Sequence, residues 1–558
     1  MNRGFGIFLV AVWGLFACTS PTSDVPSKTV RTTAEETRSA GIADTGGPTV
    51  GDDVGKPAPS HGVNKPQPGT VGPSAPGLRD ERASVAPAVS DAMPEIADGS
   101  DIPYNGNDNG KDVLLQGFYW TSKDYNKDNK NWYGYLKSLI PDIKSNFTAV
   151  WLPPPASSAD GQGYMPSDWA NLNTPYGSAQ DLKALITALH RARPPVKVIA
   201  DIVVNHRSAK EQCSNGIWDQ YSYSSFGMGS PDFMDHTVDI IGDGNKKGDN
   251  DHMRSGANEG TWSYNGRTYS NEDFGGSSDL NHWNYATRNT IKTWLKWLKS
   301  PTNAGFDGWR YDMIGGYDPA FLGEYNHDSN PYLSVGEKPA GERQMLADMV
   351  NRSGNQTMVF DFPMRDALAK ALGDINHMYG NDLGDAGTEN TEKGLIGWWP
   401  NVAVTLVNNH DIQPNHETVG RGTFPWGVTG STSGVTTQAA YAYILTHPGI
   451  PSVFIFDWKD RGPELTHAID NLIKIRQANN VTRQSRVYID KAEDGLYAAY
   501  VGVKDGEQLA IKIGKTGRQN YEDWKPNPAL GLAEAYTQFE PSGHAYCVYY
   551  KNKVDIAK

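Results

Sequence analysis

The chain has 558 residues, which is too long for one compact domain and predicts two to four folding units. Its 38% hydrophobic content, with 16 Trp and 27 Tyr, is enough for a large core. A formal net charge of -13 argues against binding to nucleic acid, whose phosphates would repel the chain, and is compatible with a neutral substrate or a cation.

The N-terminus has the pattern of an export signal. Arg3 precedes an apolar run over residues 5–16, which is too short to span a bilayer as a permanent helix. Residues 15–18, Leu-Phe-Ala-Cys, resemble a bacterial lipobox, in which the cysteine is lipidated and becomes the mature N-terminus. An ordinary secretory signal cleaved nearby is the alternative. Both interpretations predict an exported bacterial protein, either secreted or anchored by a lipid on Cys18 at the cell surface or outer membrane.

Residues 19–103 contain no Phe, Trp or Tyr and are rich in Pro, Gly, Ser, Thr, Ala and Asp. Such a segment cannot bury enough apolar surface to offset its ordering entropy, so we expect it to be disordered. As a flexible tether it would have a root-mean-square reach of about 50 Å. It would hold a folded body, beginning near Tyr104, away from a membrane surface.

From Tyr104 onward, short apolar runs alternate with segments of helical periodicity. In one such segment the apolar residues of 182–189 share a face, and Ser178 with Asp181 three residues later is a capping-box pattern. Eight strands alternating with helices favour a (β/α)8 TIM barrel over a doubly wound sheet. The predicted strands cover residues 113–119, 149–152, 197–204, 305–312, 332–337, 358–362, 402–407 and 452–456.

Two further regions depart from the barrel pattern. The connection after the third strand, residues 206–281, is unusually long and rich in Gly, Asp, Asn, Ser and Tyr, which predicts an irregular inserted subdomain suited to a hard cation such as calcium. After about residue 465, a helix and short alternating runs predict a C-terminal antiparallel β-domain over residues 466–558. The barrel itself would occupy residues 104–465.

Polar residues follow four of the predicted strands, where a (β/α)8 barrel carries its active site. One polar strand end is often only a solvated terminus, but four on one rim predict a site. They are residues 201–206, 310–312, 336–337 and 408–411.

A rim with these side chains fits cleavage of a glycosidic bond. Two carboxyl groups about 5 Å apart permit a double displacement, in which one attacks the anomeric carbon and the other protonates the leaving oxygen. Arg310 lies two residues before Asp312, on the same face of the strand, and would keep that carboxylate ionised. Glu337 would keep its proton, because the neighbouring Lys338 is expected to point to the opposite face.

Four strings in this order and at these intervals resemble the signature regions of the α-amylase family of glycoside hydrolases: DIVVNH at 201–206, GFDGWRYD at 305–312, VGE at 335–337 and NNHD at 408–411. The resemblance covers residues 112–558 and is strongest to plant-type and related bacterial α-amylases, including those that release short maltooligosaccharides. It implies retaining, endo-acting hydrolysis of α-1,4-glucosidic bonds in starch- or glycogen-type glucans.

The resemblance also implies roles for single residues. Asp312 would be the nucleophile, Glu337 the general acid/base, and Asp411 the third carboxylate, which binds hydroxyls of the distorted sugar. The residues implied in substrate binding are Tyr164, His206, Arg310 and His410.

A structural calcium ion is implied in the same way. Asn205 and Asp279 would bind Ca²⁺ through side chains, and Phe274, Ser277 and Gly316 through carbonyl oxygens. The ion would pin the long third connection to the barrel and shape the cleft.

Three positions depart from the family pattern. Gly315 stands where a basic residue is frequent, Lys338 where an aromatic residue is frequent, and Asn408 where an acidic residue is usual. The first two positions contact sugar on the leaving-group side in the family. The product pattern and the balance between hydrolysis and transfer are therefore left open.

Alternatives remain at this point. An exo-acting maltooligosaccharide-forming amylase or a transglycosylase would use the same residues, whereas a non-catalytic glucan-binding lipoprotein would not need all three carboxylates. The expected partner is an α-glucan, and no nucleic acid is expected to bind. We expect the protein to be a monomer whose contact with a membrane is limited to the lipid on Cys18. In this fold the inserted subdomain and the terminal domain are far apart, so we expect Cys213 and Cys547 to be unpaired thiols.

Overall fold

The computed structural model describes most of the chain after residue 103. The predicted signal peptide and tether, with Cys18, lie outside the described residues, as do Cys213, Phe274 and Ser277. Within the described part, no helix is both long enough and apolar enough to cross a membrane. The described ranges are residues 104–208, 240–241, 261–272, 278–280, 282–283, 285–339, 342–373, 394–412, 433–493, 495–503, 506–539 and 544–556.

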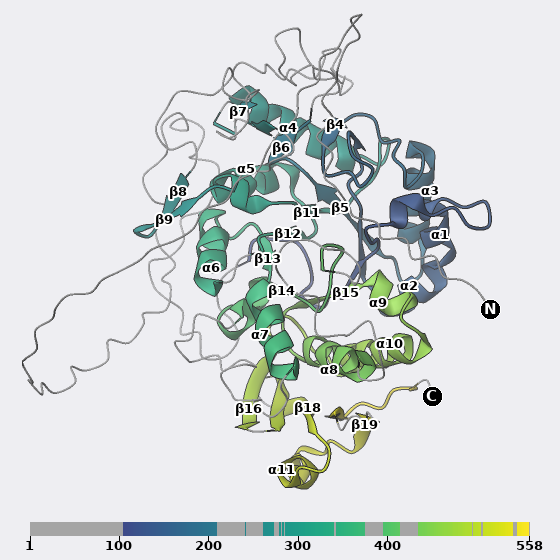
Figure 1. Cartoon of the computed structure of the whole chain (residues 1–558), viewed down its shortest axis with the longest axis vertical. Helices are drawn as coiled ribbons and strands as arrows, with labels where there is room; N and C mark the ends of the chain where they lie inside the picture. The colour runs from purple at the N-terminus through teal and green to yellow at the C-terminus, as the bar shows by residue number, and fades with distance from the viewer. Residues whose placement is uncertain are drawn as a thin grey trace, which may run out of the picture. The chain divides into compact units, whose positions relative to one another are not determined.

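Eight parallel strands close into a barrel, in the order β1-β15-β14-β13-β12-β11-β5-β2, so the predicted fold class is confirmed (Figure 1). Their side chains are almost all buried, as expected for parallel strands covered on both faces. Seven of the strands lie within their predicted runs, and the last begins and ends two residues earlier than predicted. The strands are β1 (Leu114–Gln116), β2 (Ala149–Leu152), β5 (Lys197–Ile202), β11 (Gly308–Tyr311), β12 (Ser334–Gly336), β13 (Met358–Phe360), β14 (Ala403–Leu406) and β15 (Ile450–Phe454).

Helices connect the strands and cover the outside of the barrel (Figure 1). In α3 the side chain of Ser178 accepts a hydrogen bond from the backbone N–H of Asp181, and the Asp181 carboxylate accepts one from the N–H of Ser178, which confirms the capping box. The helices of this region are α1 (Trp132–Ser138), α2 (Ile140–Asn146), α3 (Ala179–Arg191), α4 (Tyr285–Lys299), α5 (Pro319–Ser329), α6 (Arg343–Arg352), α7 (Phe362–Gly373), α8 (Ser433–Thr446), α9 (Ile455–Lys459) and α10 (Pro463–Ala478).

The described part of the long third connection forms small sheets. Strands β6 (His206–Arg207), β10 (Ser278–Leu280) and β7 (Ile240–Ile241) pair in that order, and β8 (Thr261–Tyr264) with β9 (Arg267–Ser270) forms a hairpin. Arg267 anchors this hairpin to α6 by a bidentate ion pair with the buried carboxylate of Asp348, at 2.6 and 2.8 Å. A further two-stranded sheet, β3 (Ser157–Ser158) with β4 (Pro166–Asp168), lies in the connection before α3.

The C-terminal domain is a five-stranded antiparallel sheet, as predicted. His447, just after α8, joins it to the barrel, because its Nε2 hydrogen-bonds the hydroxyl of Tyr497 at 2.8 Å. Cys547 is buried and unpaired in this sheet; the state of Cys213 stays a prediction. The strands, in sheet order, are β16 (Arg486–Glu493), β17 (Leu496–Val503), β18 (Gly506–Lys515), β20 (His544–Tyr550) and β19 (Glu534–Phe539), with α11 (Gln519–Asp523) after β18.

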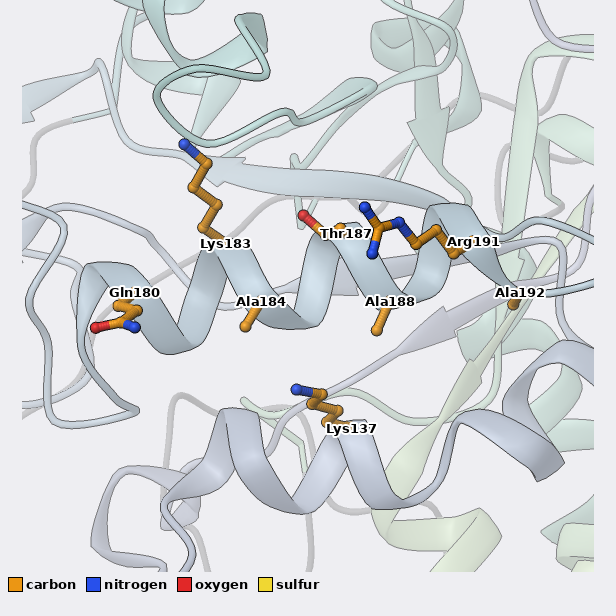
Figure 2. Close-up of a pocket in the computed structure, with 8 residues that line it drawn as sticks. All are labelled: Lys137, Gln180, Lys183, Ala184, Thr187, Ala188, Arg191 and Ala192. Atoms are coloured by element: carbon orange, nitrogen blue, oxygen red, sulfur yellow. The ribbon is translucent and has the colours of Figure 1, made fainter.

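A groove of about 630 Å³ lies between α1 and α3 (Figure 2). Lys137 of α1 points toward α3, whose Ala184 and Ala188 form the opposite wall, and Lys183 and Arg191 add two further cations. None of the predicted site residues lines this groove, so it is separate from the polar strand ends.

Candidate active site

The polar strand ends converge around one buried guanidinium, that of Arg310. Its Nη1 lies 2.8 Å from Oδ1 of Asp201 on the neighbouring strand and 2.7 Å from Oδ1 of Asp312, while Nη2 lies 3.8 Å from Oε2 of Glu337. Burial alone would lower the pKa of Arg310, but the Asp201 and Asp312 carboxylates hold it well above its ordinary value. One permanent positive charge therefore contacts three acidic side chains from three strands.

Glu337 is a buried acid, with 6% of its surface exposed. The backbone N–H of Met313 donates to its Oε2 at 3.1 Å. Met313 itself has a left-handed backbone conformation, with φ of 47°, which is unusual for a residue with a side chain and turns this N–H toward the acid. Burial raises the pKa of Glu337 to about 8, with Arg310 opposing and Asp312 and Asp411 reinforcing the rise. These surroundings favour the protonated form of Glu337 at neutral pH.

Lys338 is also buried, and its ammonium forms an ion pair with the carboxylate of Glu272. Any Cβ on residue 315 would crowd that carboxylate and the Lys338 side chain. Gly315, one of the departures from the family pattern, thus leaves room for the Glu272–Lys338 pair. Glu272 is also held to the same turn by the hydrogen bond from its N–H to the carbonyl of Gly315, at 3.0 Å.

Tyr164 and His410 form a hydrogen-bonded chain beside Arg310. The Tyr164 hydroxyl donates to Oδ2 of Asp201 at 2.9 Å and lies 2.8 Å from Nε2 of His410. Because the hydroxyl has only one proton, it accepts from Nε2–H of His410. This tautomer leaves Nδ1 of His410 to accept from the Gln116 amide at 2.8 Å. Burial raises the pKa of Asp201 to about 7, although Arg310 opposes the rise.

Three rings in this part of the site are nearly parallel. The Tyr164 and His410 rings differ by 6° with centroids 5.3 Å apart. Trp120, which follows β1, lies 6.3 Å from Tyr164 at 7° and 6.1 Å from His410 at 12°. Together they make an aromatic surface in which Tyr164 and His410 are buried and Trp120 is half-buried, and the face of such a ring can stack on a sugar.

Asp411 lies at the exposed edge of the cluster, with 41% of its side chain exposed and its Oδ2 3.5 Å from Nε2 of His410. The backbone N–H groups of Asp411 and Ile412 donate to Oδ1 of Asn409, at 3.0 and 3.1 Å, which forms a tight turn. The turn sets the direction in which the Asp411 carboxylate points.

His206, predicted to contact substrate, is fully buried. Its Nε2 lies 2.7 Å from the carbonyl oxygen of Tyr164, and its Nδ1 lies 3.2 Å from the amide nitrogen of Asn205. The structure thus places His206 beneath the Tyr164 loop, where it supports the aromatic surface.

The described part of the predicted calcium site brings Asn205, Asp279 and Gly316 together. Asn205 donates to Oδ1 of Asp279 at 3.0 Å, and its own Oδ1 is buried without a hydrogen-bond partner. A Cβ on Gly316 would overlap that oxygen, so only glycine permits this approach. Among the residues that the structure describes, no group of three or more His, Cys, Asp or Glu could hold a metal. The side chains that the structure brings together here, the Asn205 amide and the Asp279 carboxylate, offer oxygen ligands, which suit Ca²⁺ better than a transition metal.

Sequence reasoning placed Asp201 in a polar strand end but gave it no role, and it did not identify Gln116 and Trp120 as members of the site. A signal existed for the role of Asp201, since a charge inside an apolar strand needs a partner and Arg310 is the residue of opposite sign inside the next predicted barrel strand. Gln116 is likewise the polar residue that ends the apolar run of β1. Trp120 ends the string LLQGFYW at 114–120, which resembles the family, but its residue type and position gave it no role.

Comparisons with known proteins agree with this geometry. Residues 131–381 match the model of the alpha amylase catalytic domain, and residues 478–550 match that of the alpha-amylase C-terminal beta-sheet domain. Over 457 residues the chain is 31% identical to "Probable alpha-amylase 2" of Arabidopsis thaliana, covering 79% of this chain and 94% of that protein.

Two further proteins are similar. Over 478 residues the chain is 27% identical to a glucan 1,4-alpha-maltotetraohydrolase of Stutzerimonas stutzeri, covering 78% of this chain and 75% of that protein. The structure of an alpha-amylase from Malbranchea cinnamomea shares the fold, with a TM-score of 0.52 at 16% identity, over 79% of this chain and 96% of that one. The two matched domain models and the similarity over nearly the whole plant relative place this chain in the α-amylase family of glycoside hydrolases.

Proposed function

We propose that the protein cleaves α-1,4-glucosidic bonds of starch- or glycogen-type glucans with retention of configuration, by double displacement at Asp312 and Glu337. The observation that carries this proposal is the contrast between the two carboxyl groups around Arg310. Asp312 accepts a charge-assisted hydrogen bond at 2.7 Å, whereas burial raises the pKa of Glu337 to about 8. Two carboxyl groups with such different surroundings supply a nucleophile and an acid at the same pH.

The roles follow from these surroundings. Asp312 attacks the anomeric carbon as the Glu337 carboxyl gives its proton to the leaving glycosidic oxygen, which yields a covalent glycosyl-enzyme. Glu337, now ionised, then takes a proton from the water that releases the sugar. Asp411 would bind hydroxyls of the distorted sugar, while Tyr164 and His410 present the aromatic surface beneath it.

Endo action is the first expectation, and the similarity to a protein named a maltotetraohydrolase makes exo action the second candidate. We expect early products from soluble starch to be a mixture of oligosaccharides, with iodine staining lost well before most reducing ends appear. Chromatography of products over time, together with a starch whose non-reducing ends are chemically blocked, measures this. One oligosaccharide from the first minutes, and no action on the blocked starch, would establish the exo-acting alternative.

We also propose that a Ca²⁺ ion links the third connection to the barrel. Asn205 would bind it through Oδ1, Asp279 through its carboxylate and Gly316 through its carbonyl, with Phe274 and Ser277 as the other predicted ligands. The orphaned Asn205 oxygen supports this assignment. The ion would supply rigidity at the cleft.

Removal of calcium by a chelator should lower the midpoint of thermal unfolding, and added Ca²⁺ should restore it. A ligand at a thousandfold excess over its Kd stabilises by about 4 kcal/mol, which scanning calorimetry resolves easily. Gly316→Ala should abolish the calcium-dependent part of the shift, because the added Cβ displaces the Asn205 oxygen. Gly134→Ala is the matched control, since a Cβ there meets only ordinary contacts of 3.4 Å. A calcium-dependent shift that persists in Gly316→Ala would disprove this ligand set.

A further inference from the structure

Asn408, the third departure from the family pattern, belongs to a buried polar network behind the candidate site. Its Nδ2 donates to Oδ2 of Asp457 at 2.8 Å, and the hydroxyl of Tyr441 donates to the same oxygen at 2.8 Å. Asn408 is 3% exposed, and Tyr441 and Asp457 are 0% exposed. The three side chains come from the end of β14, from α8 and from α9, so the network joins three elements behind one strand end.

The network holds one buried carboxylate, whose Oδ2 accepts two hydrogen bonds and whose Oδ1 has no hydrogen-bond partner. The charged or titratable groups facing Asp457 are Tyr441 from α8 and Arg461, whose Nη1 lies 3.5 Å from Oδ1 of Asp457. An acidic residue at position 408 would put a second carboxylate at hydrogen-bond distance from the first. Two ionised carboxylates in contact repel each other and have no proton for a hydrogen bond, so one of them would have to take up a proton. The amide of Asn408 removes this conflict.

The same segment carries Asp411. Asn408 is held by its hydrogen bond to Asp457. Asn409 forms the turn that directs Asp411. The ring of His410 is held by hydrogen bonds to Tyr164 and Gln116. The Asp411 side chain is 41% exposed, so its orientation depends on the rigidity of the backbone on either side of it. A misplacement of about 1 Å in such a group can cost on the order of a hundredfold in rate.

We propose that Asn408 and Asp457 are a positioning pair for Asp411, in which one partner has to be an amide and the other a carboxylate. This inference rests on the proposed function, because it takes Asp411 to stabilise the transition state. Neither member of the pair is placed to touch the substrate. Both act through the backbone of residues 408–411.

The test is an amide–carboxylate exchange in the full chain. N408D should lower kcat on soluble starch by about a hundredfold at neutral pH and change KM much less. The reason is that a misplaced Asp411 carboxylate would lose contacts to the sugar that form mainly in the transition state. The exchanged variant N408D/D457N should recover to within about tenfold of wild type, since it again holds one amide and one carboxylate. The loss in N408D should shrink toward acid pH, where one of the two carboxyls binds a proton and becomes a donor.

N479D is the matched control. Asn479 is buried at the end of α10 and donates to the carbonyl of Ile475 at 2.9 Å, so this variant also adds a carboxylate to a buried site but leaves the active-site segment intact. It should lower the unfolding midpoint and leave kcat unchanged. If N408D fails to fold, the exchanged variant decides alone, because it has to fold and be active.

Three outcomes would overturn the proposal that Asn408 and Asp457 position Asp411. They are wild-type kcat in N408D, equal losses in N408D and N408D/D457N with both folded by circular dichroism, and a loss in N479D as large as that in N408D. An inactive wild-type protein would instead overturn the proposed function, and this inference with it.

Discussion

Asp312→Asn should abolish most of the activity on soluble starch, with kcat reduced by about 10⁴-fold or more and KM changed little. Asparagine has the size of aspartate but cannot form the glycosyl-enzyme bond. The fold should survive, because Arg310 keeps its ion pair with Asp201 at 2.8 Å when the second carboxylate is lost. Release of reducing ends by wild type and variant at equal concentration measures the effect.

Asp318→Asn is a matched control for this experiment. Like Asp312, Asp318 is an aspartate paired with an arginine, with Oδ1 and Oδ2 at 2.8 and 2.6 Å from Arg352, but it caps α5 and lies outside the polar cluster. Breaking this pair should destabilise the protein by about 3–5 kcal/mol and leave kcat within a few fold. Residual activity of Asp312→Asn above about one percent, with the wild-type unfolding midpoint, would contradict the nucleophile assignment.

Patterns of neighbouring residues in the sequence predicted the barrel and the order of its strands well. Most barrel strands are short and mainly apolar, and the alternation of side chains along β11 correctly puts Arg310 and Asp312 on one face. Six of the eight barrel strands are shorter than predicted: β12, for example, covers Ser334–Gly336, whereas the apolar pattern suggested residues 332–337. Apolar residues flanking a strand can be buried without joining its hydrogen-bond ladder, and sequence alone does not distinguish the two cases.

Such local patterns could not predict contacts between segments that are far apart in the sequence. Gln116 reaches His410 across 294 positions, and Glu272 reaches Lys338 across 66. No periodicity encodes these pairs, because they depend on which loops the closed barrel brings together. The sequence identified Gly315, Lys338 and Asn408 as unusual, but their partners, Glu272 and Asp457, became visible only in three dimensions.

The role of Glu337 as the acid can be tested by the pH dependence of the wild-type enzyme and by the Glu337→Gln variant. Because burial raises the pKa of Glu337 to about 8, with Asp312 and Asp411 adding to the rise and Arg310 opposing it, the working acid form is present below that pH. Wild-type kcat/KM should therefore fall as pH rises through about 8. A carboxyl with an ordinary pKa would have placed this loss near pH 4 to 5.

Glu337→Gln should lower kcat on starch by about 10³- to 10⁴-fold, because glutamine has no proton to give to a sugar leaving group. An aryl maltooligoside with a nitrophenol leaving group needs no such proton, so formation of its glycosyl-enzyme should be nearly as fast as in wild type. Without a general base, water releases the sugar slowly and the intermediate accumulates as a burst. The alkaline limb near pH 8 should then be absent from the burst rate.

Added azide separates this role from a structural one. Azide needs no general base, so it should attack the accumulated intermediate, restore turnover of the aryl substrate and give a glycosyl azide of retained configuration. Glu324→Gln offers a control, because Glu324 is a mostly buried glutamate that bonds Arg288 and Lys292 between α4 and α5. That variant should lose stability, keep the alkaline limb and show no response to azide. If Glu337→Gln behaves like Glu324→Gln, the acid lies elsewhere on the rim, and Asp411 is the next carboxyl to test.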